Sequence, residues 1–160
     1  MTMDERELKD LMGVLKMMED LELSMAELYQ TCAQMGFQDR EFWAGMEQAE
    51  VKHAKHLDKM KNIVMEKPER FTLGRPFKTA AIRTSIAGIQ SYIQRLRKKE
   101  ISEKKMLHIC RDIEQAVLEA SYAEVIKTEE PEFRSLMNGM TSDTSFHREG
   151  LMKKIKTMAD

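Results

Sequence analysis

Glycine, proline and cysteine are scarce in this sequence, which contains 7 Gly, 3 Pro and 2 Cys among 160 residues. Few helix breakers, together with 15 Met and 33% charged residues, are typical of long amphipathic helices. Long alternating runs of β-branched residues are also missing, which argues against a sheet protein. The sequence therefore predicts an all-α fold, and its length suits one domain with a substantial core.

The two cysteines, Cys32 and Cys110, lie far apart and form no Cys-x-x-Cys pair. This excludes a zinc ribbon or a rubredoxin-type knuckle and offers no disulfide framework. The acidic, polar first residues do not resemble a signal peptide, and no apolar run is long enough to cross a membrane. We therefore expect a soluble cytoplasmic protein whose cysteines are small core residues.

The net charge of -1 creates no field that would attract nucleic acid or an anionic membrane. One basic cluster interrupts this neutrality, and no aromatic side chains are interleaved with it as a nucleic-acid groove would require. We interpret it as a solvated helix end, where cations favour the macrodipole. The cluster comprises Arg95, Arg97, Lys98, Lys99, Lys104 and Lys105.

Apolar residues recur at three- and four-residue steps through the first part of the chain, as they do on one face of a helix. The spacing predicts a first helix over residues 4–35, ended by Gly36. Asp39 is a suitable N-cap for a second helix. The two helices make a predicted hairpin over residues 1–65.

The middle of the chain, residues 66–101, is rich in proline and glycine at its start and is expected to be a long crossover. A third amphipathic helix is predicted from about Pro76, at a helix-starting position. Residues 102–160 predict a second hairpin, with Ser102 as the cap of its first helix. Glu130-Pro131 breaks this part of the chain.

Together these segments predict a single domain over residues 1–160, namely a four-helix bundle of two hairpins joined by a crossover that contains an extra helix. Gly139 and the Thr-Ser-Asp run that follows Met140 are points where we expect the last helix to be interrupted.

Five ionisable residues stand on the apolar stripes of four predicted helices, with no inward Lys or Arg to match them. A buried carboxylate is costly unless it is paired, protonated or bound to a metal. A single such residue is best explained as a rim residue or part of a salt bridge, but five together favour a metal site. Carboxylates with imidazoles suit iron, manganese or zinc better than calcium or magnesium. The five are Glu22, Glu50, His53, Glu114 and His147.

The two hairpins repeat one another. Glu22 precedes His53 by 31 residues and Glu114 precedes His147 by 33, a difference that a turn absorbs. A duplicated hairpin facing itself would bring these groups together at its centre. The second helices of the hairpins also align, so that Met46, Glu50, His53 and Leu57 fall on Met140, Thr144, His147 and Leu151.

These residues give most of the chain a resemblance to the ferritin-like superfamily and, within it, to the rubrerythrin-related proteins. The resemblance rests on Glu22 with its downstream Tyr29, on Glu50-x-x-His53 inside AEVKHAKHL, and on Glu114 with the nearby Tyr122. It implies a non-haem di-iron oxidoreductase that reduces peroxide or oxidises ferrous iron, and it makes a homodimer the default assembly.

Carried onto this chain, the resemblance makes Glu22 and Glu114 terminal metal ligands, Glu50 a bridge, and His53 and His147 ligands to one metal each. No catalytic residue and no cofactor beyond the metal is assigned. Manganese or zinc in place of iron remains open, as does the number of ions, one or two.

The sequence departs from the family at Thr144, where a second bridging Glu is expected. The adjacent Asp143 is rotated by about 100° around a helix, so it can substitute only if the helix begins there or is distorted. A complete two-metal site, a single or altered site and a metal-free relic all remain open. The relic would be a degenerate bundle acting as a non-catalytic binding or scaffold protein.

A second departure is the missing rubredoxin-like module, so an enzyme of this kind needs an external electron donor. His56 and His108 are expected at the surface rather than at the metal. Tyr29 and Tyr122 are candidates for hydrogen bonds to a ligand, although packing at the edge of the core is the favoured interpretation. The many methionines are interpreted as core filling rather than as copper ligands.

Overall fold

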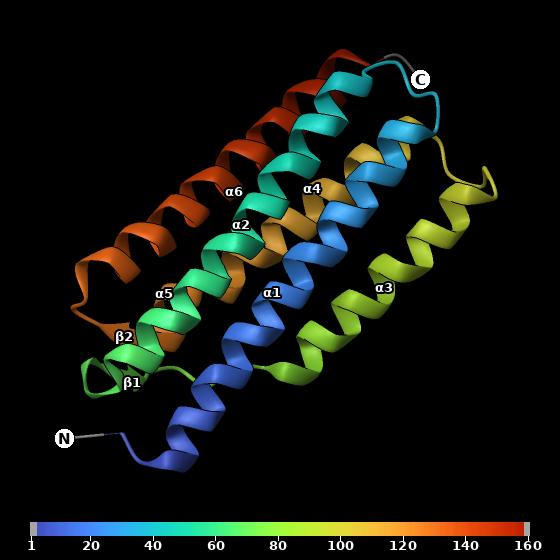
Figure 1. The fold of residues 1–160 in the computed structure, drawn as a ribbon. Coiled ribbons are helices and arrows are strands. Elements are labelled where there is room, and N and C mark those ends of the chain that lie inside the picture. Colours follow the sequence, from blue (N-terminus) through green and yellow to red (C-terminus); the bar gives the residue numbers. More distant parts are fainter. Residues whose placement is uncertain (1–2, 159–160) are drawn as a thin grey trace.

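The computed structural model describes residues 3–158, so the first two and last two positions of the expected domain lie outside the described residues. The chain is predominantly helical (Figure 1), which confirms the all-α prediction. The helices are α1 (Glu5–Gln34), α2 (Arg40–Glu66), α3 (Thr79–Arg97), α4 (Glu103–Ala120), α5 (Tyr122–Val125) and α6 (Pro131–Thr157). A 3₁₀ turn (Pro68–Arg70) and two short strands, β1 (Phe71–Leu73) and β2 (Ile126–Thr128), complete the structure.

Capping side chains and a glycine turn set the ends of the first two helices. Asp4 and Glu7 form a capping box, in which the Asp4 carboxylate accepts from the Glu7 amide at 2.8 Å and the Glu7 carboxylate accepts from the Asp4 amide at 3.1 Å. Gly36, with φ 75°, makes the turn that follows α1. Asp39 then caps α2 by accepting from the Phe42 amide at 3.1 Å. These bounds agree with the predicted ones to within a residue.

The crossover differs from the prediction in two ways. α3 begins at Thr79 instead of Pro76. Before it, the amides of Gly74 and Arg75 donate to the carbonyls of Val125 and Glu124 at 2.7 and 2.9 Å. β1 pairs antiparallel with β2, with Phe71 opposite Thr128. Strands of three residues are too short to give an alternating pattern, so the sequence does not predict them. Gly74 follows β1, and a Cβ there would lie 2.4 Å from the backbone oxygen of Glu124, which allows no side chain.

In the second hairpin, α4 and α6 are separated by a stretch of chain that contains α5 and β2. Ser102 caps α4 as predicted, accepting from the Lys105 amide at 3.2 Å. α4 ends at Ala120, and Ser121 adopts a left-handed conformation with φ 50°. The chain then passes through α5 and β2 to reach Pro131, the first residue of α6.

The predicted interruption of the last helix is wrong. α6 continues through Gly139 and the Thr-Ser-Asp run without a break. The hydroxyls of Thr141 and Thr144 donate back to the carbonyls of Met137 and Met140 at 3.2 and 2.9 Å, so these side chains are accommodated within the helix.

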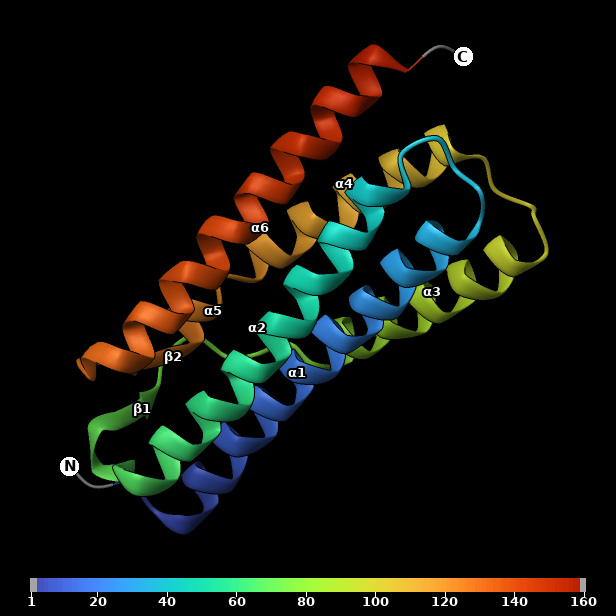
Figure 2. The same ribbon diagram turned by 45° about the horizontal axis from the view of Figure 1, so that its top comes forward.

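The long helices lie side by side around one apolar core. α1 packs along α2, α4 packs along α6, and α3 covers the outer side of α1 (Figure 2). Trp43, Tyr29 and the Phe71–Phe133 pair are fully buried, and Cys32 and Cys110 are buried core residues as expected. None of the helices within residues 3–158 is long and apolar enough to span a membrane.

Candidate metal centre

The structure brings all five predicted site residues together in the interior. α1 supplies Glu22, α2 supplies Glu50 and His53 one turn apart, α4 supplies Glu114, and α6 supplies His147. The three carboxylates and His53 are at most 1% exposed, and the His147 side chain is 10% exposed. Each residue occupies an inward position of its helix, because its neighbours three or four residues away belong to the core.

Glu50 lies at the centre of the cluster. Its Oε2 is 3.3 Å from His53 Nδ1, and its Oε1 is 3.1 Å from His147 Nδ1, so its two oxygens face different imidazoles. The Glu22 carboxylate is 3.7 Å from His53 Nδ1, and the Glu114 carboxylate is 3.5 Å from His147 Nδ1.

The cluster therefore consists of two overlapping groups that share Glu50. One is Glu22, Glu50 and His53, and the other is Glu50, Glu114 and His147; within each group the possible ligand atoms lie within 4.8 Å of one another. Each group has the spacing and the oxygen and nitrogen donors that can hold a metal ion.

Several atoms of the cluster have no hydrogen-bond partner among the described residues. They are both oxygens of Glu22, Oε1 of Glu50, Oε2 of Glu114 and Nδ1 of His147. Native interiors rarely leave buried polar atoms unpaired. No Lys or Arg is buried within residues 3–158, so no lysine or arginine neutralises the three carboxylates there. The donor set and the unpaired atoms fit a bound metal cation.

The protonation of the cluster follows from its burial and charge. Burial raises the pKa of Glu22 well above its usual value, and the Glu50 carboxylate raises it further. Burial alone lowers the pKa of both histidines, but the carboxylates outweigh it: Glu22 and Glu50 raise the pKa of His53 to about 11, and Glu114 and Glu50 raise that of His147 to about 10. At neutral pH the ion-free cluster therefore holds protons that a metal must displace.

The family pattern places a second bridging glutamate at position 144, and neither Thr144 nor the adjacent Asp143 takes its place. Thr144 is buried beside the cluster, but its hydroxyl is bonded to the Met140 carbonyl and it carries no charge. Asp143 lies outside the cluster with 47% of its side chain exposed, and its Oδ2 is 2.9 Å from His53 Nε2. α6 is undistorted, so Asp143 orients the outer nitrogen of a possible ligand and does not replace the missing carboxylate.

The two tyrosines have different environments. The Tyr29 hydroxyl donates to Glu114 Oε1 at 2.6 Å, which fixes that carboxylate. Tyr122 is 6% exposed, and its hydroxyl has no partner among the described residues. His56 and His108 are partly exposed and belong to neither metal-binding group.

A small cavity of about 200 Å³ borders the cluster on one side. Glu22, Tyr122 and Thr144 line it, together with residues at the break between α4 and α5. The cavity gives a small molecule a position next to the carboxylates.

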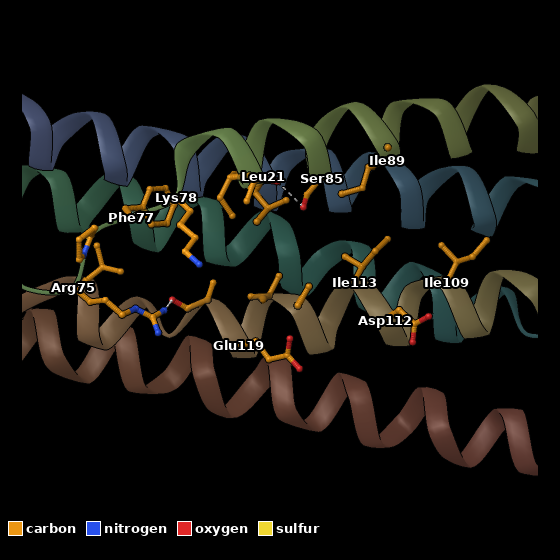
Figure 3. A pocket seen from close by; sticks show the side chains of 18 of the residues that line it. Leu21, Arg75, Phe77, Lys78, Ser85, Ile89, Ile109, Asp112, Ile113 and Glu119 are labelled. Atoms are coloured by element: carbon orange, nitrogen blue, oxygen red, sulfur yellow. Dashed lines mark hydrogen bonds between the residues drawn. The ribbon is translucent and has the colours of Figure 1, made fainter.

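A larger groove of about 730 Å³ lies elsewhere, between α3 and α4 (Figure 3). Apolar side chains dominate it, with Arg75 and Lys78 at one end and Ile109 at the other. Arg75 is already bonded to the Ala120 carbonyl. None of the five cluster residues lines this groove, so the larger cavity is not where the ionisable groups converge.

No protein-family model matches the chain, and neither a curated protein nor a solved structure matches it. The residues themselves form a buried Glu/His cluster that can hold a metal ion.

Proposed function

We propose that α1, α2, α4 and α6 form a ferritin-like, rubrerythrin-related four-helix bundle that binds two metal ions at the buried cluster. The position of Glu50 carries the proposal. Glu50 has one oxygen facing His53 and the other facing His147, and each histidine also lies near a second carboxylate. A carboxylate that bridges two cations has this arrangement.

Charge and donor type support iron, manganese or zinc as the metal, and iron is the one that the resemblance implies. Three carboxylates compensate most of the charge of two divalent ions, while two imidazoles add neutral donors. Mixed oxygen and nitrogen ligands suit iron, manganese and zinc. Asp143 orients His53, and the Tyr29 hydroxyl holds Glu114, so two of the ligands are positioned before a metal binds.

A two-iron centre, when bound, supplies electrons for reducing peroxide or accepts them in oxidising ferrous iron. The chain contributes a dry, carboxylate-lined interior and a small cavity beside Glu22 that admits a molecule of a few atoms. Since Cys32 and Cys110 are buried in the core, an external donor would supply the electrons for turnover. A homodimer remains our proposed assembly.

A metal-free binding or scaffold protein is the second candidate. The raised pKa values of His53 and His147 favour it, because two imidazolium ions offset part of the carboxylate charge without a metal. Thr144 favours it too, since a fourth carboxylate is missing.

Metal analysis separates the two candidates. We expect protein from iron-supplemented cells, and metal-free protein titrated anaerobically with ferrous iron, to bind up to two ions per chain. Glu50→Gln, which keeps the shape of the side chain but removes its charge, should lose most of that binding. Glu41→Gln, at an exposed position on the same helix, is the matched control and should bind normally. A folded protein that takes up no iron, manganese or zinc would support the scaffold.

A further inference from the structure

The cavity beside Glu22 is located where α4 breaks. Ser121, a non-glycine residue with φ 50°, ends α4 in the left-handed conformation and turns the chain into α5. Such a conformation is costly and occurs preferentially at functional sites. The cavity of about 200 Å³ lies between this break and the inner face of α6.

Thr144 leaves this space open. The internal repeat aligns Thr144 with Glu50, and Thr144 lines the cavity together with Glu22. Its hydroxyl is already bonded to the Met140 carbonyl, so it offers the cavity mainly a short apolar surface. A glutamate at this position would extend a carboxylate farther into the same space.

Tyr122 supplies an unpartnered donor to the cavity. Its ring lines the space, and its buried hydroxyl has no hydrogen-bond partner among the described residues. Burial raises the pKa of Tyr122, and the neighbouring Glu22, Glu50 and Glu114 charges raise it further, so the hydroxyl keeps its proton. An unpaired buried donor is costly, and an acceptor in the cavity would remove that cost.

The charge of a loaded cluster also favours an anion. Three carboxylates around two divalent ions leave one positive charge in a dry interior, and buried charge is costly unless it is compensated. A volume of about 200 Å³ holds a molecule the size of several waters, each of which takes roughly 30 Å³, but not a long chain.

We propose that this cavity binds a small monocarboxylate, such as formate or acetate, which takes the place of the fourth carboxylate absent at Thr144 and accepts a hydrogen bond from Tyr122. The inference rests on the proposed metal centre. Without the metal ions, Glu22, Glu50 and Glu114 repel the ligand, so binding depends on metal loading.

Zinc-loaded protein tests the proposal without redox chemistry. Binding of ¹³C-formate is measured by NMR line broadening and by calorimetry, with zinc content determined for every sample. We expect formate to bind zinc-loaded protein and to bind metal-free protein at least about tenfold more weakly. Acetate should compete, whereas hexanoate, which is too long for the cavity, and chloride, which is not a carboxylate, should compete poorly.

Variants at the cavity locate the ligand. Thr144→Glu, which supplies its own carboxylate, should lower formate affinity at least about tenfold while zinc is retained. Thr144→Gln fills the space without a charge and should do the same, so the test does not depend on one variant folding. Tyr122→Phe should weaken formate binding several-fold or more, since one hydrogen bond to a charged group is lost. Tyr92→Phe, on α3 beside the separate groove, is the matched control.

The outcomes distinguish the two proposals. Protein that binds zinc but not formate overturns the carboxylate site and leaves the metal centre standing. Protein that binds none of zinc, iron and manganese overturns the metal centre and, with it, the carboxylate site. Equal formate binding with and without zinc, undiminished binding in both Thr144 variants, or equal competition by chloride would each refute the carboxylate proposal.

Discussion

The carboxylate of Asp143 on α6 accepts a hydrogen bond from His53 on α2, with 2.9 Å between Oδ2 and Nε2. This contact leaves His53 Nδ1 facing Glu22 and Glu50. It connects the two hairpins at a residue that is itself half exposed, so it can be altered without disturbing the core.

Asp143→Asn should lower metal affinity by about 10- to 100-fold, the usual effect of losing a carboxylate that orients a ligand histidine. The fold should persist, because Asp143 contributes little to the core. Calorimetric titration with zinc measures the loss. Asp10→Asn, at an exposed position on α1, is the control; equal affinities in the two variants would show that Asp143 does not position His53.

Tyr29→Phe should destabilise the metal-free protein by roughly 1.5–3 kcal/mol, because Glu114 loses a buried, charge-assisted hydrogen bond of 2.6 Å. Urea unfolding gives the value. The loss should shrink markedly in a Glu114→Gln background, where the bond to a charged acceptor is already gone. An equal loss in both backgrounds would mean that the Tyr29 hydroxyl stabilises the protein through another contact.

The metal-free protein should lose stability as pH rises. His53 and His147 have folded-state pKa values of about 11 and about 10, above an unfolded value of about 6.5. Their contribution is therefore fully present below about pH 6.5 and is lost as pH rises through 10 to 11. The raised pKa of Glu22 acts in the same direction. Urea unfolding across this range should show the decline, and a curve that rises steadily from pH 7 to 10 would contradict it.

Metal affinity should follow the opposite trend and increase with pH. A metal must displace the protons on the two histidines, so binding at neutral pH releases protons, and the raised pKa of Glu22 acts in the same direction. Zinc titrations in buffers with different ionisation enthalpies count these protons. Uptake without proton release would show that the ions bind outside the cluster.

Thr144→Glu should strengthen binding of the second metal ion by on the order of tenfold or more. Two unit charges about 4 Å apart interact by roughly 4 kcal/mol at an effective dielectric of 20, and a divalent ion carries two such charges, before the cost of burying the carboxylate. The same variant should be less stable than the natural sequence when metal-free. Metal content and urea unfolding of matched samples test both halves of the prediction.

Gly74→Ala should destabilise the protein by about 1–3 kcal/mol, because its Cβ would clash with the backbone carbonyl of Glu124 in α5, next to the end of β1. Gly88→Ala provides the comparison. It lies within α3 with no atom within 4 Å of its Cβ, and alanine should stabilise the helix by about 0.5–1 kcal/mol. Melting temperatures that shift in the same direction in Gly74→Ala and Gly88→Ala would contradict the steric explanation.

Local patterns were sufficient to predict the five long helices, although not the start of α3, the continuity of α6 or the short α5, and to choose the residues of the cluster. Capping residues such as Asp39 and Ser102 act within one turn, and an inward Glu22 is apparent from its apolar neighbours on the same helix. The internal repeat indicated that the ionisable residues of the two hairpins meet, but the other interactions between distant segments were not predictable. A helical wheel shows that Asp143 points away from Thr144. It does not show that α2 lies close enough for His53 to contact Asp143. The β1–β2 pairing was missed for the same reason.

The arrangement of the cluster has a consequence for symmetry. The repeated hairpins relate Glu22 to Glu114 and His53 to His147, but Glu50 corresponds to Thr144 and has no acidic counterpart. The surroundings differ as well, because Asp143 is paired with His53 and not with His147, and Tyr29 donates its hydrogen bond to Glu114 and not to Glu22. Two identical ions bound here would be chemically inequivalent, one bordering the cavity at Glu22 and the other beneath Tyr29. They should fill one after the other, with distinct spectra, instead of as a matched pair.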